Sequence, residues 1–390
     1  MYTVMKTHGL LFAAEGLSER DVEKGLSLAG RVHPQYRPVF DEMSEEDRAA
    51  VALYFLPHGS KKDVLEVTRP RAVKWYCPFA DQRTFPSGHR YSINVYTGCE
   101  HRCQYCYVNG YSARQPDCKH RFRQDLCKDL EALEAFDVPP APVHLSNSTD
   151  ALQPLEQSHR HTLFTLEKLA EHRNRFTTVT LLTKNPAALV EDGYIQVLRR
   201  LNWFPTDHPR RGWFEEKGFP PLRLEISLAF VNDEHRRLLD PAAPSVEDRM
   251  AAIRQLRQQD LPVFLRIDPL FPRDPLGGGK KMADFGLPDV QSMSDLEGLV
   301  AFGHEVGIHG IIYSVAKITR LRQGGLSPVM EQMKRVYQHL SAKQPLVFRG
   351  GSWRFSENVA RERVVGPYLE LCDRYSISAK PCKANLLTTP

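Results

Sequence analysis

From about residue 91 onward, short apolar runs rich in β-branched residues alternate with longer stretches whose apolar residues recur at helical spacing. Six of these runs are predicted strands: Tyr91–Tyr96, Val143–Ser146, Thr177–Thr183, Leu222–Leu228, Val263–Ile267 and Gly310–Val315. Predicted amphipathic helices lie between them, among them Glu156–His172, Pro186–Leu201, Ser245–Gln259 and Ser294–Val306. Such alternation predicts a parallel sheet with right-handed crossovers. We therefore expect an α/β fold, a partial (β/α)6 barrel of the TIM type.

The segments on either side of this alternating region do not share its pattern. Two Ser-x-x-Asp pairs near the start are typical of helix N-termini: Ser18 with Asp21, and Ser44 with Asp47. We predict a small N-terminal helical appendage over residues 1–75, a core domain over residues 76–325 and a C-terminal extension over residues 326–390.

Composition excludes several classes of protein. The 390 residues are 42% hydrophobic and 25% charged, as in a globular protein. No apolar run approaches the roughly 18 residues that span a bilayer, so we expect a cytoplasmic protein with no membrane partner. The net charge of +5 is too small to indicate a nucleic-acid partner without a clustered patch. The 8 cysteines do not suit a disulfide framework in such a chain, and their spacing points to metal or redox chemistry.

Three cysteines stand together directly after the first predicted strand. Cys99, Cys103 and Cys106 have a C-x3-C-x2-C spacing on one predicted loop. Three soft thiolates can hold three irons of a cubane cluster, which leaves the fourth iron open to chelate a small molecule and pass it an electron. The alternative is a zinc site, which needs four N or S ligands and would have to recruit His101 or a remote cysteine. We therefore predict a [4Fe–4S] cluster bound by three cysteines.

This spacing, with Tyr105 just before the third cysteine, resembles the signature of the radical S-adenosylmethionine (SAM) superfamily. The resemblance implies that the open iron binds SAM, whose reductive cleavage releases a 5′-deoxyadenosyl radical. It also implies a reductase or a flavodoxin-type electron donor as partner. Over about residues 91 to 320 the chain is similar to the spore photoproduct lyase-like group, also called DNA repair photolyases. The strings that carry this similarity are Ser148–Glu156, Leu182–Lys184, Glu225–Ser227, Asp240–Pro241 and Asp268–Pro272.

The resemblance assigns cofactor contacts to four residues. Lys184 and Ser227 match positions that contact SAM in the lyase, and Lys184 would reach the SAM carboxylate or ribose. Ser148 and Asp150 follow the second strand, where radical SAM enzymes place polar groups that grip the amino end of SAM. Roles without a cofactor remain as alternatives: Lys184 would be an ordinary solvated lysine, and Ser148 and Asp150 would cap a helix.

Two tyrosines and one substitution concern catalysis. Tyr105 and Tyr107 match tyrosines that flank the third cluster cysteine in the lyase and pass a hydrogen atom; alternatively, both pack over the cluster and adenine. The lyase has a radical-quenching cysteine where this chain has Asn147, so a different hydrogen donor is required. The remaining cysteines, which could include such a donor or bind an auxiliary cluster, are Cys77, Cys118, Cys127, Cys372 and Cys382.

Three substrate hypotheses stay open. The first is a nucleic-acid base, with DNA or another nucleic acid as partner, because basic and aromatic residues are interleaved at Lys119–Arg123, Trp203–Phe214 and Arg349–Phe355. The second is a small metabolite or peptide, with residues 202–221, a predicted exposed loop, acting as a lid. The third is a non-catalytic iron–sulfur or zinc module that binds nucleic acid or senses redox state.

Overall fold

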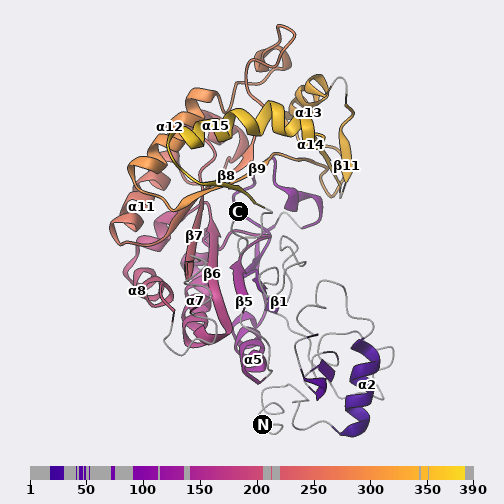
Figure 1. The fold of residues 1–390 in the computed structure, drawn as a ribbon, viewed down its shortest axis with the longest axis vertical. Helices are drawn as coiled ribbons and strands as arrows, with labels where there is room; N and C mark the ends of the chain where they lie inside the picture. Colours follow the sequence, from indigo (N-terminus) through magenta and orange to yellow (C-terminus); the bar gives the residue numbers. More distant parts are fainter. Residues whose placement is uncertain are drawn as a thin grey trace.

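The structure is a computed structural model of the chain (Figure 1). It describes residues 18–29, 41, 44–46, 48–49, 52, 72–74, 91–112, 115–135, 141–204, 212, 220–341, 344–349 and 351–382.

An eight-stranded sheet forms the centre of the molecule, with the strand order β1-β2-β5-β6-β7-β8-β9-β13. Six of its strands were predicted from the sequence: β2 (Tyr91–Ile93), β5 (Ala141–Leu145), β6 (Phe176–Thr183), β7 (Leu222–Ser227), β8 (Val263–Leu270) and β9 (Gly310–Val315). Within this set of six, every strand forms parallel hydrogen bonds with the one that follows it in the set. Among the described residues the edge strands β1 and β13 do not pair with each other, which confirms a partial barrel.

Helices follow the strands as the sequence predicts, and α7, α8, α11 and α12 lie along one side of the sheet (Figure 1). The helices between β4 (Asp117–Cys118) and β9 include α5 (Phe122–Ala135), α6 (Leu155–His159), α7 (His161–Glu171), α8 (Asp192–Leu201), α10 (Asp233–Leu239), α11 (Val246–Gln258) and α12 (Met293–Glu305). The predicted helix Glu156–His172 is split, because Arg160 has a left-handed φ of 50° that ends α6 and begins α7. The predicted helix Pro186–Leu201 starts instead as a 3-10 turn, Pro186–Val190, before α8.

Both flanking segments contribute to the central sheet. Strand β1 (Val73–Lys74) pairs antiparallel with β2, and β13 (Ala379–Pro381) pairs in parallel with β9. The predicted N-terminal helix is α2 (Glu19–Ala29), in which the Asp21 backbone N–H donates to Ser18 Oγ at 3.3 Å. Of the second predicted cap, Ser44 is followed by helical residues, whereas Asp47 lies outside the described residues.

Within its described residues, the C-terminal extension has three helices and, besides β13, two strands, which join a strand just before the extension in a small sheet. The helices are α13 (Pro328–Leu340), α14 (Glu357–Ala360) and α15 (Gly366–Arg374), the last two joined by a π-helical turn, Arg361–Val365. The small sheet has the order β10-β12-β11 and consists of β10 (Ile318–Thr319), β12 (Ser352–Arg354) and β11 (Val347–Arg349). Most of the predicted loop 202–221 lies outside the described residues; Trp203 is exposed, whereas Phe204 is buried against Arg173.

The central strands β7 and β8 are buried almost throughout on both faces, but the two faces differ in chemistry. On β7, Leu224 and Ile226 belong to the hydrophobic core, whereas Glu225 and Ser227 line a cavity on the inside. On β8, Arg266 and Asp268 line the same cavity. Residues two apart in a strand share a face, so this polar alternation marks the inner surface of the barrel. In the part of the chain that the structure describes, no helix is long and apolar enough to cross a membrane.

Candidate functional site

A cavity of about 450 Å³ lies where the carboxyl ends of β5 to β9 converge, a size usual for ligand sites. All nine residues that the sequence analysis assigned to a site line this cavity: Cys99, Cys103, Tyr105, Cys106, Tyr107, Ser148, Asp150, Lys184 and Ser227. They come from the loop after β3 (Tyr96–Thr97) and from the ends of β5, β6 and β7. The structure therefore brings the predicted site residues together at the open end of the barrel.

The cysteine loop begins with a residue that must be glycine. Gly98 has a φ of +71°, and a Cβ built there would lie 2.7 Å from the carbonyl oxygen of Gln115. A side chain at this position would therefore meet both backbone strain and a steric clash. This turn places Cys99 at the cavity directly after β3.

Three hydrogen bonds hold the cysteine loop from two sides. The Glu100 N–H donates to Gln153 Oε1 at 2.8 Å, and the Leu155 N–H donates to Glu100 Oε2 at 2.7 Å. On the other side, the Gln104 N–H donates to the Leu239 carbonyl at 2.8 Å. The protein alone thus fixes the path of the loop, as a preorganised ligand site requires.

The three loop thiols are available as metal or cluster ligands. All seven cysteines that the structure describes are free. Burial raises the pKa of Cys103 well above its ordinary value, so a bound cation is needed to make it a thiolate. Among the described residues, one group of three possible metal ligands has all its ligand atoms within 4.8 Å of one another. That group does not include the three loop cysteines. Both ring nitrogens of His101, the ligand that a zinc site would recruit, already contact Asp150 (3.1 Å) and the Ala242 carbonyl (3.4 Å).

Lys184 is the centre of a buried network. Its ammonium donates to Tyr105 Oη at 2.9 Å, to Ser227 Oγ at 2.9 Å and to Asp240 Oδ2 at 3.1 Å. A lysine has three N–H donors, so all of them are used. Burial opposes the charged form, but the carboxylate of Asp240 raises the pKa of Lys184 above its ordinary value. Lys184 is therefore a largely buried cation whose three N–H donors all have protein partners.

Asp240 was not assigned to the site from the sequence, although it lies in the matching Asp240–Pro241 string. It is fully buried beneath the cysteine loop, after α10. Burial alone would raise the pKa of Asp240, but Lys184 and Arg249 outweigh burial and lower it. Only the fold reveals this ion pair, because its partners lie 56 residues apart in the chain.

Asp150 holds neighbouring segments together. Its Oδ1 accepts from Thr183 Oγ1 at 2.7 Å and from the Leu152 N–H at 2.8 Å, and its Oδ2 accepts from the Lys184 N–H at 2.7 Å. Burial opposes ionisation, but His101 and these hydrogen bonds lower the pKa of Asp150 to about 2. With both oxygens engaged, Asp150 is an ionised cross-link between the ends of β5 and β6.

Tyr107 and Ser148 both hydrogen-bond to Asn147, the residue that the sequence resemblance sets against a lyase cysteine. Tyr107 Oη donates to the Asn147 carbonyl, and Tyr111 Oη donates to Ser148 Oγ at 3.1 Å. The Asn147 side chain donates to Ser92 Oγ at 2.8 Å and accepts from Asn94 at 2.9 Å. Asn147 therefore anchors two polar segments at the cavity wall and has no hydrogen atom on sulfur to offer.

A second polar group in the cavity was missed by the sequence analysis. Arg266 pairs with Glu225 at 2.6 Å and with Asp268, and it donates to Cys382 Sγ at 2.8 Å. The Cys382 N–H donates to the Tyr313 carbonyl at 2.7 Å, which fixes the end of β13 at the cavity. Of the other four cysteines, Cys77 lies outside the described residues and three do not line the cavity: Cys118, Cys127 and Cys372. The polar alternation on β7 and β8 was the available signal for Glu225, Arg266 and Asp268.

The ionisation of Glu225 predicts a specific loss of stability in acid. Burial alone would raise the pKa of Glu225, but the charges of Arg266, Arg223 and His144 outweigh it and lower the pKa to about 2. Because this pKa is lower in the folded chain than the ordinary 4.5, the ionised carboxylate stabilises the fold above that pH. We expect the difference in unfolding free energy between the wild type and Glu225→Gln to shrink as the pH falls from about 5 to about 2. Urea titrations across this range measure it, and a constant difference would contradict the assignment.

Fold and site together define an α/β protein whose partial parallel barrel carries a three-cysteine loop at its open end. No family model matches the sequence. An uncharacterised protein of Methanocaldococcus jannaschii is 23% identical over 188 residues, which are 47% of this chain and 62% of that protein.

Several solved structures are similar to the chain. Spore photoproduct lyase matches with a TM-score of 0.45 and 14% identity over 78% of both chains, and one of its structures contains AdoMet and a dinucleoside spore photoproduct. SuiB of Streptococcus suis, bound to its precursor peptide SuiA, matches with a TM-score of 0.37 and 9% identity over 65% of this chain and 46% of that chain. The radical SAM methyltransferase TsrM of Kitasatospora setae, with cobalamin and a [4Fe–4S] cluster, matches with a TM-score of 0.40 and 10% identity over 67% of this chain and 42% of that chain.

Proposed function

We propose that this chain is a radical SAM enzyme. The observation that carries the proposal is the clamped loop with three free cysteines that line a cavity at the open end of a partial barrel. Cys99, Cys103 and Cys106 would hold a [4Fe–4S] cluster. With SAM on its open iron, such a cluster supplies a 5′-deoxyadenosyl radical when an electron arrives from a reductase or flavodoxin-type donor.

The chain's own residues would position the reactants and exclude water. Lys184 holds the hydroxyls of Tyr105 and Ser227 at the cavity wall, and exchange of one of these hydrogen bonds would let it bind the SAM carboxylate or ribose. Ser148 and the backbone around Asp150 face the cavity from the next strand and would bind the amino end of SAM. Tyr107 would lie beside the substrate, because its ring faces the cavity next to Lys317.

The proposed substrate is a base in a nucleic acid. The small sheet at the C-terminal extension supports this choice, because Arg354 on β12 lines the cavity while Phe348 on the neighbouring β11 is 52% exposed. A guanidinium near the cavity suits a phosphate, and an exposed ring suits a stacked base. A base turned out of its stack would fit a cavity of this size next to SAM.

The test is an anaerobic incubation of cluster-reconstituted protein with SAM, a reductant and DNA or RNA, followed by mass spectrometry of 5′-deoxyadenosine and of the digested nucleosides. We expect one altered nucleoside to appear in step with 5′-deoxyadenosine. Binding of the nucleic acid should weaken steeply between about 50 and 200 mM salt, because phosphate contacts release counterions.

Two single variants, Phe348→Ala and Arg354→Ala, are each expected to lower turnover on the nucleic acid. The formation of 5′-deoxyadenosine in the absence of a substrate should stay unchanged in both. Glu357→Ala, on the exposed start of α14, is the matched surface control. Cleavage of SAM that is stimulated by a small metabolite or a peptide, with no altered nucleoside, would replace the nucleic-acid proposal and leave the radical SAM proposal intact.

A further inference from the structure

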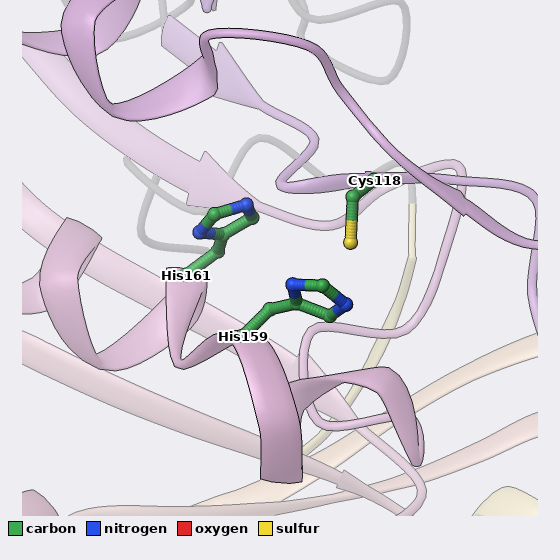
Figure 2. A group of neighbouring side chains, drawn as sticks. All are labelled: Cys118, His159 and His161. Atoms are coloured by element: carbon green, nitrogen blue, oxygen red, sulfur yellow. The ribbon is translucent and has the colours of Figure 1, made fainter.

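Three possible metal ligands converge on the molecule's surface away from the cavity. Cys118 ends β4 (Asp117–Cys118), His159 ends α6, and His161 begins α7. Their ligand atoms all lie within 4.8 Å of one another, and Figure 2 shows the thiol and the two imidazole rings arranged as a triangle. None of the three lines the cavity.

The backbone between the two histidines is bent in a way that brings both rings to the thiol. Residues two apart on a continuous helix do not face each other. Here Arg160, between them, has a φ of 50°, a left-handed conformation that costs a non-glycine residue free energy and that often marks functional sites. The break separates α6 from α7 and points His159 and His161 toward Cys118.

The chemistry of this group is that of a zinc-type site. One thiolate and two imidazoles are the borderline-soft ligands that Zn²⁺ prefers, and three protein ligands leave the fourth tetrahedral position to water. Burial and the carboxylates of Asp117 and Glu156 raise the pKa of the Cys118 thiol, and the same negative charge favours a bound cation, which would in turn stabilise the thiolate. Arg123 opposes it with a weak 3.4 Å contact to His161 Nδ1, although its main hydrogen bond, at 2.7 Å, goes to the His159 carbonyl.

We propose that Cys118, His159 and His161 bind one divalent transition-metal ion of the zinc type. The ion would fix the base of the cysteine loop, because Cys118 pairs in register with Tyr96 on β3, three residues before Cys99. The ring of Tyr96 also stacks on that of His161, with the centroids 5.8 Å apart. A metal here would thus tie β3, β4 and the α6–α7 junction together. This inference does not depend on the proposed enzymatic function.

The experiment uses the full-length protein with its cluster reconstituted anaerobically, so that the loop cysteines are occupied before zinc is added. After equilibration with Zn²⁺ and removal of the excess, we expect one zinc per chain in addition to the iron. X-ray absorption at the zinc edge is expected to show one sulfur at about 2.3 Å and N/O ligands at about 2.0 Å. Zinc left at the loop cysteines would instead show several sulfur ligands, which distinguishes the two sites.

Cys118→Ser and His159→Ala are each expected to weaken zinc binding more than roughly 100-fold, since even loss of a supporting partner costs 10–100-fold. His159 is exposed, so its replacement tests the site without disturbing the core. The matched controls are His120→Ala and Cys127→Ser, a neighbouring histidine and a neighbouring cysteine outside the group; both should keep wild-type affinity. If zinc does not bind, or if it binds equally well to Cys118→Ser and His159→Ala, the proposal is wrong.

Discussion

Replacing Cys103 with alanine is expected to abolish both the visible absorption of the reconstituted protein and the formation of 5′-deoxyadenosine. Cys103 is buried at the centre of the clamped loop, and no further cysteine lies on that loop to take its place. Each thiolate would hold a separate iron, so the loss of one leaves a cluster with only two protein ligands. Iron and sulfide analysis, together with chromatography of the SAM cleavage products, measures the effect. The same result is expected for Cys99→Ala and Cys106→Ala.

Cys127→Ala is the matched control, because Cys127 is a partly buried cysteine on α5 that does not line the cavity. It should retain wild-type iron content and SAM cleavage. If Cys103→Ala still cleaves SAM, the three-cysteine assignment is wrong. If the wild-type protein purified without oxygen contains one zinc at the loop cysteines and no iron, both the cluster assignment and the radical SAM proposal are wrong.

Local patterns account for the parts of this structure that were predicted correctly. The strands from β5 to β9 are long enough for their apolar runs to be recognised, and the helices between them repeat apolar residues at the helical period. The cysteine spacing is local as well, since the three thiols lie within eight residues of sequence, 99–106. Each of these features is set by neighbours in the chain, so it is readable before folding.

The features that were missed depend on contacts between distant segments. Strands β1 and β13 have only two and three residues, too few to show a period, and they form only because the central sheet offers them an edge. The contact of Cys382 with Arg266 joins residues 116 apart. Asp150 follows a strand like many helix caps, but its carboxylate accepts from Thr183 and Lys184 on the neighbouring segment. The residues that the sequence assigned to the site do line one cavity, but the sequence did not show which of its polar groups are already paired.

The largest effect on stability is expected at Lys184. Replacing it with methionine removes the ion-pair partner of the fully buried Asp240 carboxylate and leaves only the more remote charge of Arg249, and breaking a buried pair from one side costs about 3–5 kcal/mol. Lys168→Met is the matched control. The ion pair of Lys168 with Glu171 is shorter, at 2.6 Å, than the 3.1 Å pair of Lys184 with Asp240, but it lies on the surface. Exposed pairs contribute only about 0–1 kcal/mol, so burial and not distance should decide the outcome.

Urea unfolding of the protein without its cluster, at neutral pH, measures both losses. The double variant Lys184→Met/Asp240→Asn is expected to recover part of the stability lost in Lys184→Met, because it removes the unpaired charge. Affinity for SAM in the cluster-reconstituted protein should stay low in this double variant, since it lacks the ammonium proposed to bind the cofactor. If the double variant recovers stability but not SAM affinity, the two roles of Lys184 are separate. Equal losses of unfolding free energy in Lys184→Met and Lys168→Met would instead show that the buried pair stabilises the fold no more than the surface pair.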